Sequence, residues 1–312
     1  MWSSNPDALP LLLRHFTTRA WPWSPRVCCV LRLPGRDRWV GRYETPAPHS
    51  TRRGMRHRPP SRARLLGAQR LPAAKVDALG SGFSAGMRVG EDVDLACRLA
   101  AKATGVRYEP AATVYHEHRT AIPDWLRRKA FYGTGADLLA QRHGRDVAPA
   151  IVTPWSAAFA TALLLQRRWS LPAAALIFAA ATLRLSRKVR NTEHPVRLGA
   201  VLTFDRALAA TWQLKALLLR HWWPLAAIGC LFSRRMRRAV AAAALFDTIV
   251  DFRRTKAHLD PFRFAVARRL DDLAYGSGVW YGAFKGRSLR ALLPDIRWTG
   301  TRGHDTRTEA DG

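Results

Sequence analysis

Two uncharged, apolar runs separated by a basic turn are the longest feature of the hydrophobic pattern. The first run covers 147–166, which is 20 residues without a charge, and the second covers 169–183. About 20 apolar residues cross a hydrocarbon core as a helix, so the first run reaches that length and the second is somewhat short. Arg167 and Arg168 lie between the runs, and cations are denser on the outer flanks. The positive-inside rule then predicts a membrane hairpin with both ends cytosolic.

Further helices are predicted toward the C-terminus. The apolar stretches 222–232 and 239–250 are too short to cross a bilayer, so we expect each to be a buried helix or one lying in the membrane interface. The Asp-Pro pair at 260–261 is typical of an N-cap followed by the first position of a longer helix. Within that helix Gly278, Gly282 and Gly286 recur every four residues, which predicts a small-residue face for close helix packing.

The part of the chain before residue 120 has the mixed pattern of an α/β domain. Acidic residues open the segment 91–100, in which Leu95 and Leu99 share one helical face, so a short helix is predicted. Residues 106–110 and 112–116 contain β-branched and aromatic residues next to helix breakers, which predicts two short strands. The opening of the chain differs, because prolines and arginines crowd residues 46–64 and predict a linker or disorder there.

The composition adds a strong positive charge to this picture. Lys and Arg total 51 against 23 Asp and Glu, giving a net charge of +28 and a sequence pI of about 11.5. Such a charge is shared by proteins that bind nucleic acids and by proteins that dock on anionic membranes, and a coding bias toward arginine is a third explanation. A non-catalytic basic protein that docks on membranes or nucleic acid is therefore one alternative, although no specific nucleic-acid module is recognisable. The four scattered cysteines indicate neither a disulfide framework nor a zinc site.

Candidate chemistry is concentrated in three short segments. Glu91 and Asp92 open the predicted helix, where the helix N-terminus stabilises an ionised carboxylate that can act as a general base. His116 and His118 come at the end of a predicted strand, and imidazole is a ready ligand for a divalent metal. The basic segment 127–129 begins with Arg127 and Arg128 and can neutralise a diphosphate leaving group.

The order of these motifs resembles that of the inverting family 2 glycosyltransferases with the A-type fold. The Gly-Glu-Asp-Val-Asp-Leu segment at 90–95 resembles the Glu-Asp motif of that family. Over about residues 80–296 the amino-acid sequence is similar to those of the mycofactocin-system glycosyltransferases in particular. The other segments that carry the resemblance are 107–110, 114–119, Trp125, 132–134, 142–144, Pro149, 221–224 and 271–276.

The resemblance implies both a fold and a reaction. The expected fold class is α/β, with a partial A-type, Rossmann-like glycosyltransferase domain followed by a mainly α-helical, membrane-associated C-terminal region. Asp92 would deprotonate the acceptor hydroxyl with Glu91 as support, and His116 or His118 would hold a divalent metal, Mn or Mg. The implied donor is a UDP-sugar, with UDP-glucose expected, and the implied acceptor is the mycofactocin peptide-derived redox cofactor or its precursor. A cell-membrane location with a cytoplasmic catalytic side is expected as well.

The chain departs from the family pattern ahead of Glu91. The family normally has a nucleotide-binding half that ends in Asp-x-Asp, whereas Asp7, Asp37 and Asp77 are isolated here. The expected organisation is an Arg/Pro-rich, poorly ordered or degraded segment at 1–75 and the C-terminal half of a glycosyltransferase domain at 76–145. A helical, membrane-associated region at 146–296 and a polar tail at 297–312 follow. A truncated or frame-shifted donor half, with impaired activity of this chain, is part of that expectation.

Overall fold

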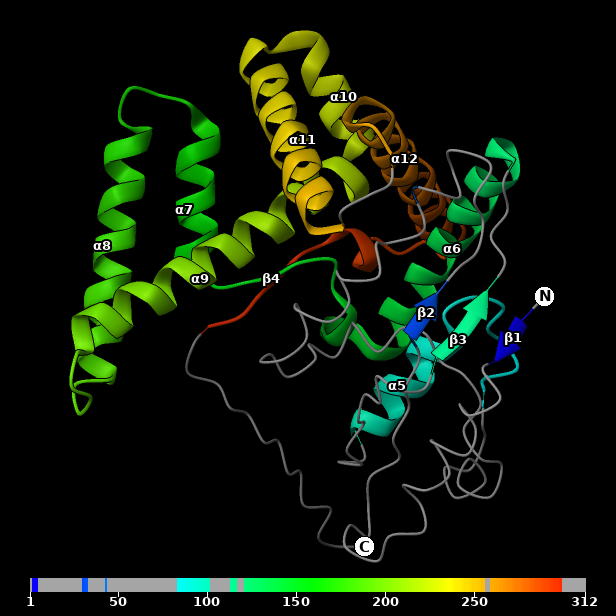
Figure 1. The fold of residues 1–312 in the computed structure, drawn as a ribbon, viewed down its shortest axis with the longest axis horizontal. Coiled ribbons are helices and arrows are strands. Elements are labelled where there is room, and N and C mark those ends of the chain that lie inside the picture. The colour runs from blue at the N-terminus through cyan, green and yellow to red at the C-terminus, as the bar shows by residue number, and fades with distance from the viewer. Residues whose placement is uncertain are drawn as a thin grey trace, which may run out of the picture. The chain divides into compact units, whose positions relative to one another are not determined.

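The computed structural model describes residues 2–4, 30–32, 43, 83–101, 113–116, 121–255 and 259–298. These residues are mainly helical (Figure 1), which confirms the helical C-terminal region predicted from the sequence. The chain divides into two compact units. The first unit consists of Met1–Pro149 and Lys215–Leu293, and the second consists of Ala150–Leu214 and Pro294–Gly312.

The first unit contains a small mixed sheet next to a short helix. Helix α5 (Glu91–Ala101) and strand β3 (Thr113–His116) have the predicted types and order. Strand β3 is central in the sheet, with β1 (Trp2–Ser4) antiparallel on one side and β2 (Val30–Arg32) parallel on the other. The strand predicted at 106–110 lies outside the described residues. The helix-then-strand order therefore agrees with an α/β domain, while the complete A-type fold stays a prediction.

Two of these strands come from the segment 1–75, which the sequence predicted to be poorly ordered. Strand β1 pairs Trp2 with His116, and strand β2 pairs Val30 with Thr113. Apart from these strands and Tyr43, that segment lies outside the described residues.

Helices α6 (Ile122–His143) and α12 (Pro261–Lys285) pack against each other over most of their length and form the centre of the first unit. Their backbones approach closely at glycines. A Cβ atom added to Gly133 would lie 2.1 Å from the carbonyl oxygen of Tyr275, and one added to Gly278 would lie 1.8 Å from that of Ala130. Neither position has room for a side chain, because real Cβ atoms do not approach backbone atoms so closely. The predicted small-residue face of this helix is confirmed.

Helix α12 begins at the Asp-Pro pair that the sequence marked as a helix start. Helix α12 begins as expected, with the backbone N–H of Arg263 donating to Asp260 Oδ1 at 2.9 Å. The unit also contains the π-helical turn η4 (Leu217–His221) and the helices α10 (Trp223–Phe232) and α11 (Arg234–Thr255). Two short 3₁₀ turns, η3 (Gly144–Val147) and η5 (Arg290–Leu292), belong to it as well.

Helix α10 corresponds to the apolar stretch for which either a buried or an interfacial helix was expected. Its side chains are mostly not buried, because Ala226 is its only buried residue while Leu225, Ile228 and Leu231 are exposed. The buried-helix interpretation is therefore wrong for α10.

The second unit is a helical hairpin followed by a third helix. Helices α7 (Pro154–Leu165) and α8 (Ser170–Lys188) run side by side (Figure 1), with the ring centroids of Phe159 and Phe178 6.4 Å apart. Helix α9 (Pro195–Ala216) follows, and its last two residues belong to the first unit. Strands β4 (Ile151–Val152) and β5 (Asp295–Ile296) pair in parallel in this unit.

The structure does not support the predicted membrane crossings. Within the described ranges, no helix combines the length and the apolar character that a bilayer crossing requires. The uncharged run 147–166 is interrupted by β4 and by Pro154, so α7 keeps only 12 residues. At about 1.5 Å per residue, a helix of that length extends about 18 Å, whereas a hydrocarbon core is about 30 Å thick. Helix α8 is longer, but three cations, Arg184, Arg187 and Lys188, occupy its C-terminal end.

Candidate active site

The predicted catalytic carboxylates lie at the start of α5, just after a sharp turn. Gly90 has a φ of +80°, a backbone conformation that favours glycine, and its carbonyl oxygen accepts the N–H of Asp94 at 2.9 Å. A Cβ atom at Gly90 would also lie 2.9 Å from Leu139 Cδ1 on α6. The turn therefore places Glu91 and Asp92 in the first helical turn of α5, as predicted.

Asp94, the third acid of this segment, anchors α5 rather than facing a substrate. Its carboxylate is 1% exposed and accepts a hydrogen bond from Ser84 Oγ at 2.7 Å and one from Arg98 Nε at 3.0 Å. His143 Nε2 lies 2.8 Å from the other carboxylate oxygen, and Arg142 lies 3.5 Å from it. Burial by itself raises the pKa of Asp94, but the hydrogen bonds from Ser84 and His143 outweigh it and the pKa is lowered. An ionised Asp94 thus ties α5 to the end of α6.

Asp92 has the opposite electrostatic environment. It is half-buried, and its Oδ1 accepts the backbone N–H of Val93 at 2.8 Å. Burial, followed by the neighbouring charge of Glu91, raises the pKa of Asp92 above its ordinary value. A raised pKa makes a carboxylate a stronger base, which is the direction that proton abstraction from a hydroxyl requires. The two aspartates of one helical turn therefore differ, with Asp94 held ionised in a network and Asp92 made more basic.

The structure does not bring the other predicted residues to Asp92. Arg127 and Arg128 are exposed near the start of α6, where Arg127 pairs with Asp124 at 3.7 Å and Arg128 Nε donates to Tyr132 Oη at 2.7 Å. The turn that precedes α5 contacts α6 at Gly135 and Leu139, about 12 and 18 Å further along the helix than Arg127 at 1.5 Å per residue.

The predicted metal ligands are only partly described. The backbone of His116 ends β3 opposite Trp2, and His118 lies outside the described residues. In the described part of the chain, no three His, Cys, Asp or Glu residues are grouped as a metal site. The metal and its ligands therefore stay predictions from the family resemblance.

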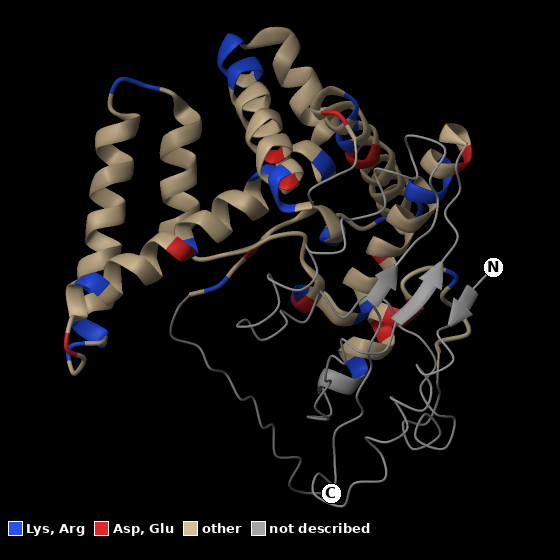
Figure 2. Ribbon diagram, viewed as in Figure 1, with Lys and Arg blue, Asp and Glu red and all other residues tan. Residues whose placement is uncertain are grey.

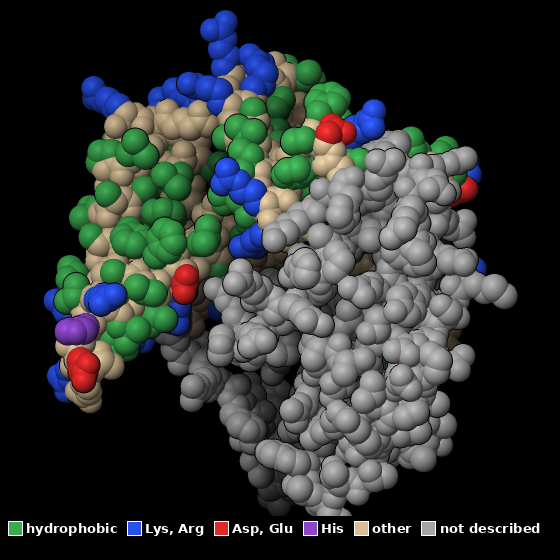
Figure 3. Space-filling view, viewed as in Figure 1, with side chains coloured by type: hydrophobic (Ala, Val, Ile, Leu, Met, Phe, Trp, Pro, Cys, Tyr) green, Lys and Arg blue, Asp and Glu red, His purple; other side chains and the backbone are tan. Residues whose placement is uncertain are grey.

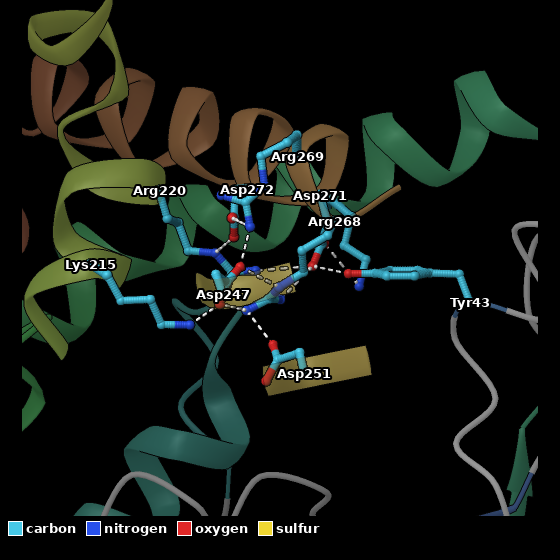
Figure 4. Close-up of polar contacts among 10 residues, drawn as sticks. Tyr43, Lys215, Arg220, Asp247, Asp251, Arg268, Arg269, Asp271 and Asp272 are labelled. Carbon is cyan, nitrogen blue, oxygen red and sulfur yellow. Dashed lines mark hydrogen bonds and ion pairs between the residues drawn. The ribbon is translucent and has the colours of Figure 1, made fainter. Parts of the chain in front are cut away.

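A second concentration of charge, which the sequence did not single out, lies inside the first unit (Figure 4). Asp247 on α11 is 1% exposed and pairs with three cations from distant segments, Lys215, Arg268 and Arg269. We call the whole group the buried charge cluster. It contains five cations and four acids: Lys129, Lys215, Arg220, Arg268 and Arg269, with Asp247, Asp251, Asp271 and Asp272.

The buried charge cluster connects the helices of the first unit. Arg220 donates to Asp272 at 2.8 Å and to Asp271 at 3.0 Å, joining η4 to α12. Lys129 on α6 lies 3.3 Å from Asp271. Tyr43 Oη donates to Asp271 at 3.4 Å, and burial raises the pKa of this phenol. Because each buried charge has an opposite partner, removing any one of them leaves a desolvated charge, and we assign the cluster a structural role.

Two signals in the sequence pointed to this cluster. Asp247 is the single acid in an otherwise apolar stretch, and a buried carboxylate requires cationic partners. Arg268 and Arg269 precede Asp271 and Asp272 by three residues, the spacing of ion pairs on one helix face. The partners Lys215 and Arg220 were not predictable in this way, because they reach Asp247 and Asp272 only through tertiary packing.

A comparison with curated proteins identifies the class of protein to which this chain is similar. The matching relatives are glycosyltransferases, as the Glu-Asp segment indicated. Two of them are the pre-mycofactocin glycosyltransferases of Mycobacterium tuberculosis strains CDC 1551/Oshkosh and ATCC 25618/H37Rv, each 41% identical over 226 residues. The match covers 69% of this chain and 47% of each relative, so the chain spans about half the length of the curated relatives it matches. The resemblance to the mycofactocin-system glycosyltransferases is confirmed, and the chain is related to them over the matched residues. No family model and no solved structure matches it.

Proposed function

We propose that this chain is an inverting glycosyltransferase that transfers a sugar to a mycofactocin precursor. The observation that supports it most is the 41% identity to pre-mycofactocin glycosyltransferases over 226 residues. The environment of Asp92 adds support, because burial and Glu91 raise the pKa of this carboxyl at the place where the family resemblance puts a base. The proposed donor is UDP-glucose.

In the proposed reaction Asp92 accepts the proton of an acceptor hydroxyl. The acceptor oxygen then forms a bond to the anomeric carbon while the bond between that carbon and the diphosphate oxygen breaks, so UDP leaves with the electron pair. The proton passes from Asp92 to solvent, and the configuration at the anomeric carbon is inverted by a single displacement. No covalent enzyme intermediate is involved.

The anchoring of α5 is the structural contribution to this step. Ser84, Arg98 and His143 hold Asp94, two residues beyond Asp92, so the first turn of α5 is fixed against α6. A base that is fixed before the reaction contributes more than a mobile one, because displacements of about 1 Å lower rates strongly. Glu91 acts through its charge, which raises the pKa of Asp92.

The proposed location is the cytoplasmic face of the cell membrane. The second unit exposes Leu171, Leu176 and Leu183 along α8. Two arginines, at 167 and 168, precede this apolar surface, and further cations begin at 184, directly after it. Apolar side chains flanked by cations are typical of proteins that associate with anionic bilayers.

The proposed function is tested first by donor binding. The purified chain is titrated with UDP-glucose by calorimetry, with and without Mn²⁺, and we expect saturable binding that strengthens with the metal. Absence of binding in both samples would contradict the proposal that this chain acts on a nucleotide sugar by itself.

The base is tested separately by transfer kinetics. Asp92→Asn keeps the shape of the side chain but removes its basicity, and we expect sugar transfer to fall by about 10²–10⁴. Asp124→Asn, at an exposed carboxylate on α6, is the matched control and should leave transfer unchanged. Equal turnover of Asp92→Asn and the unmodified chain would exclude Asp92 as the base.

A further inference from the structure

We propose that the junction of α10 and α11 is a docking surface for a lipid bilayer with anionic headgroups. This surface, which we call the hairpin tip, comprises residues 230–238 and belongs to the first unit. It is separate from the Asp92 site and from the hairpin of the second unit, so it does not depend on the proposed transfer reaction.

The hairpin tip presents two large apolar side chains to solvent. Leu231 is 74% exposed and Phe232 is 85% exposed, the highest value among the large hydrophobic residues that the structure describes. They end α10, whose Leu225 and Ile228 are also exposed. Solvated leucine and phenylalanine side chains are unfavourable in water, and their transfer to an apolar phase stabilises the state in which they are inserted.

Four arginines follow this apolar pair at the start of α11. Arg234, Arg235, Arg237 and Arg238 are all exposed. Figure 2 draws the start of α11 in the colour of Lys and Arg, and Figure 3 shows Lys and Arg side chains projecting at this end of α11 beside hydrophobic ones. No acidic residue occurs between Asp205 and Asp247 in the sequence. The local field of the tip is therefore positive, and the complementary partner carries negative charge.

The position of the arginines is not explained by the stability of α11. They occupy the first turns of that helix, whose first turn contains no acid. Cations are unfavourable at a helix N-terminus, because the helix dipole and the unpaired N–H groups there favour anions. The same geometry is suited to phosphate groups, which receive both the guanidinium charges and the positive end of the helix. The arrangement is thus unfavourable for the isolated chain and favourable for the bound one.

The tip also has a fixed shape. Arg237 Nη1 donates to the carbonyl oxygen of Cys230 at 2.7 Å, across the turn from α11 to the end of α10. This bond holds Leu231 and Phe232 next to the arginines, so apolar and cationic groups are presented together. Nucleic acid would match the arginines but leave the exposed leucine without a partner, whereas a bilayer interface takes up both.

Vesicle flotation with the full chain tests the proposal. We compare vesicles of phosphatidylcholine with vesicles that also contain phosphatidylglycerol, at low and at high salt. The ratio of the affinity for phosphatidylglycerol-containing vesicles to the affinity for pure phosphatidylcholine vesicles measures the contribution of the anionic headgroups to binding. Apolar insertion by other parts of the chain contributes to both affinities and cancels in this ratio. We expect Arg234→Gln/Arg238→Gln to weaken binding to the anionic vesicles about thirty-fold, from about fivefold per arginine near an anionic surface. Phe232→Ser should weaken binding to them about tenfold.

The matched control is Arg253→Gln/Arg254→Gln at the other end of the same helix. It removes two exposed arginines and the same net charge, so a nonspecific charge effect lowers vesicle binding equally in both variants. Because removing cations from the first turns of α11 does not destabilise the helix, thermal unfolding of the tip variant should be unchanged or shifted upward. Equal loss in the two arginine variants, or no preference for anionic vesicles, overturns the proposal. Tip-dependent binding to a duplex oligonucleotide without vesicle binding also overturns it.

Discussion

Replacing Asp247 with Asn tests the physical account of the buried charge cluster. The side chain is only 2% exposed and faces Lys215, Arg268 and Arg269, and the Lys215 side chain is 4% exposed. Asparagine keeps the volume but leaves five cations facing three acids inside the first unit. Removing one partner of a buried ion pair costs about 3–5 kcal/mol of unfolding free energy. That cost is large compared with the roughly 5–15 kcal/mol that stabilises a typical domain.

The assay is urea unfolding followed by tryptophan fluorescence at neutral pH. With a typical slope of about 1–3 kcal/mol per molar urea, a loss of about 3–5 kcal/mol lowers the midpoint by at least about 1 M, and by about 2 M at the middle of both ranges. Asp124→Asn is the control, since Asp124 is 47% exposed and its pair with Arg127 is worth less than about 1 kcal/mol. The double variant Lys215→Met/Asp247→Leu removes one charge of each sign and should recover most of the loss. Equal midpoints for Asp247→Asn and Asp124→Asn would refute the reasoning.

Three more outcomes are expected. Folding lowers the pKa of Asp94, so the contribution of this carboxylate to stability is present at neutral pH and is lost as the pH falls through the folded pKa. In Asp94→Asn, the free energy of unfolding should therefore depend less steeply on pH in the acidic range. Burial, then the charge of the adjacent Arg220, lowers the pKa of His221 from 6.5 to about 4, so the unfolded chain binds this proton at a higher pH than the folded one does. The free energy of unfolding should therefore decrease by about 3 kcal/mol as the pH falls from 6.5 to about 4, and His221→Gln should abolish that decrease. Gly133→Ala should lower the thermal midpoint, since its Cβ would meet the Tyr275 oxygen at 2.1 Å, whereas Gly86→Ala meets nothing closer than 3.8 Å and should not.

The candidate base was located by its sequence, but its environment was not. The Gly-Glu-Asp segment predicted a helix start with carboxylates in its first turn, and α5 begins at Glu91 as expected. The sequence placed Asp92 and Asp94 in one acidic group. Their different roles depend on His143, which lies 49 positions away and contacts Asp94 through packing of α5 on α6. Local sequence fixes which groups are charged, whereas the pKa depends on neighbours that only the fold supplies.

The same division holds for the helical part of the chain. The Asp-Pro pair at 260–261 and the glycines at 278 and 282 predicted where α12 begins and which face packs closely, because caps and small residues act through local geometry. Hydrophobic runs were a weaker guide. The run 147–166 divides into a turn, a strand and a short helix, and α10 is exposed instead of buried.

Sequence by itself indicated the relationship to the mycofactocin-system glycosyltransferases over the matched residues, the helical character and the first turn of α5. Tertiary structure alone decided that Asp247 is neutralised by Lys215, Arg268 and Arg269, and that Leu231 and Phe232 stay in solvent beside arginines. The reason is physical. Helix caps, turns and glycine contacts depend on a few adjacent residues, whereas burial and charge pairing depend on which distant segments the packed helices bring within a few ångströms of each other.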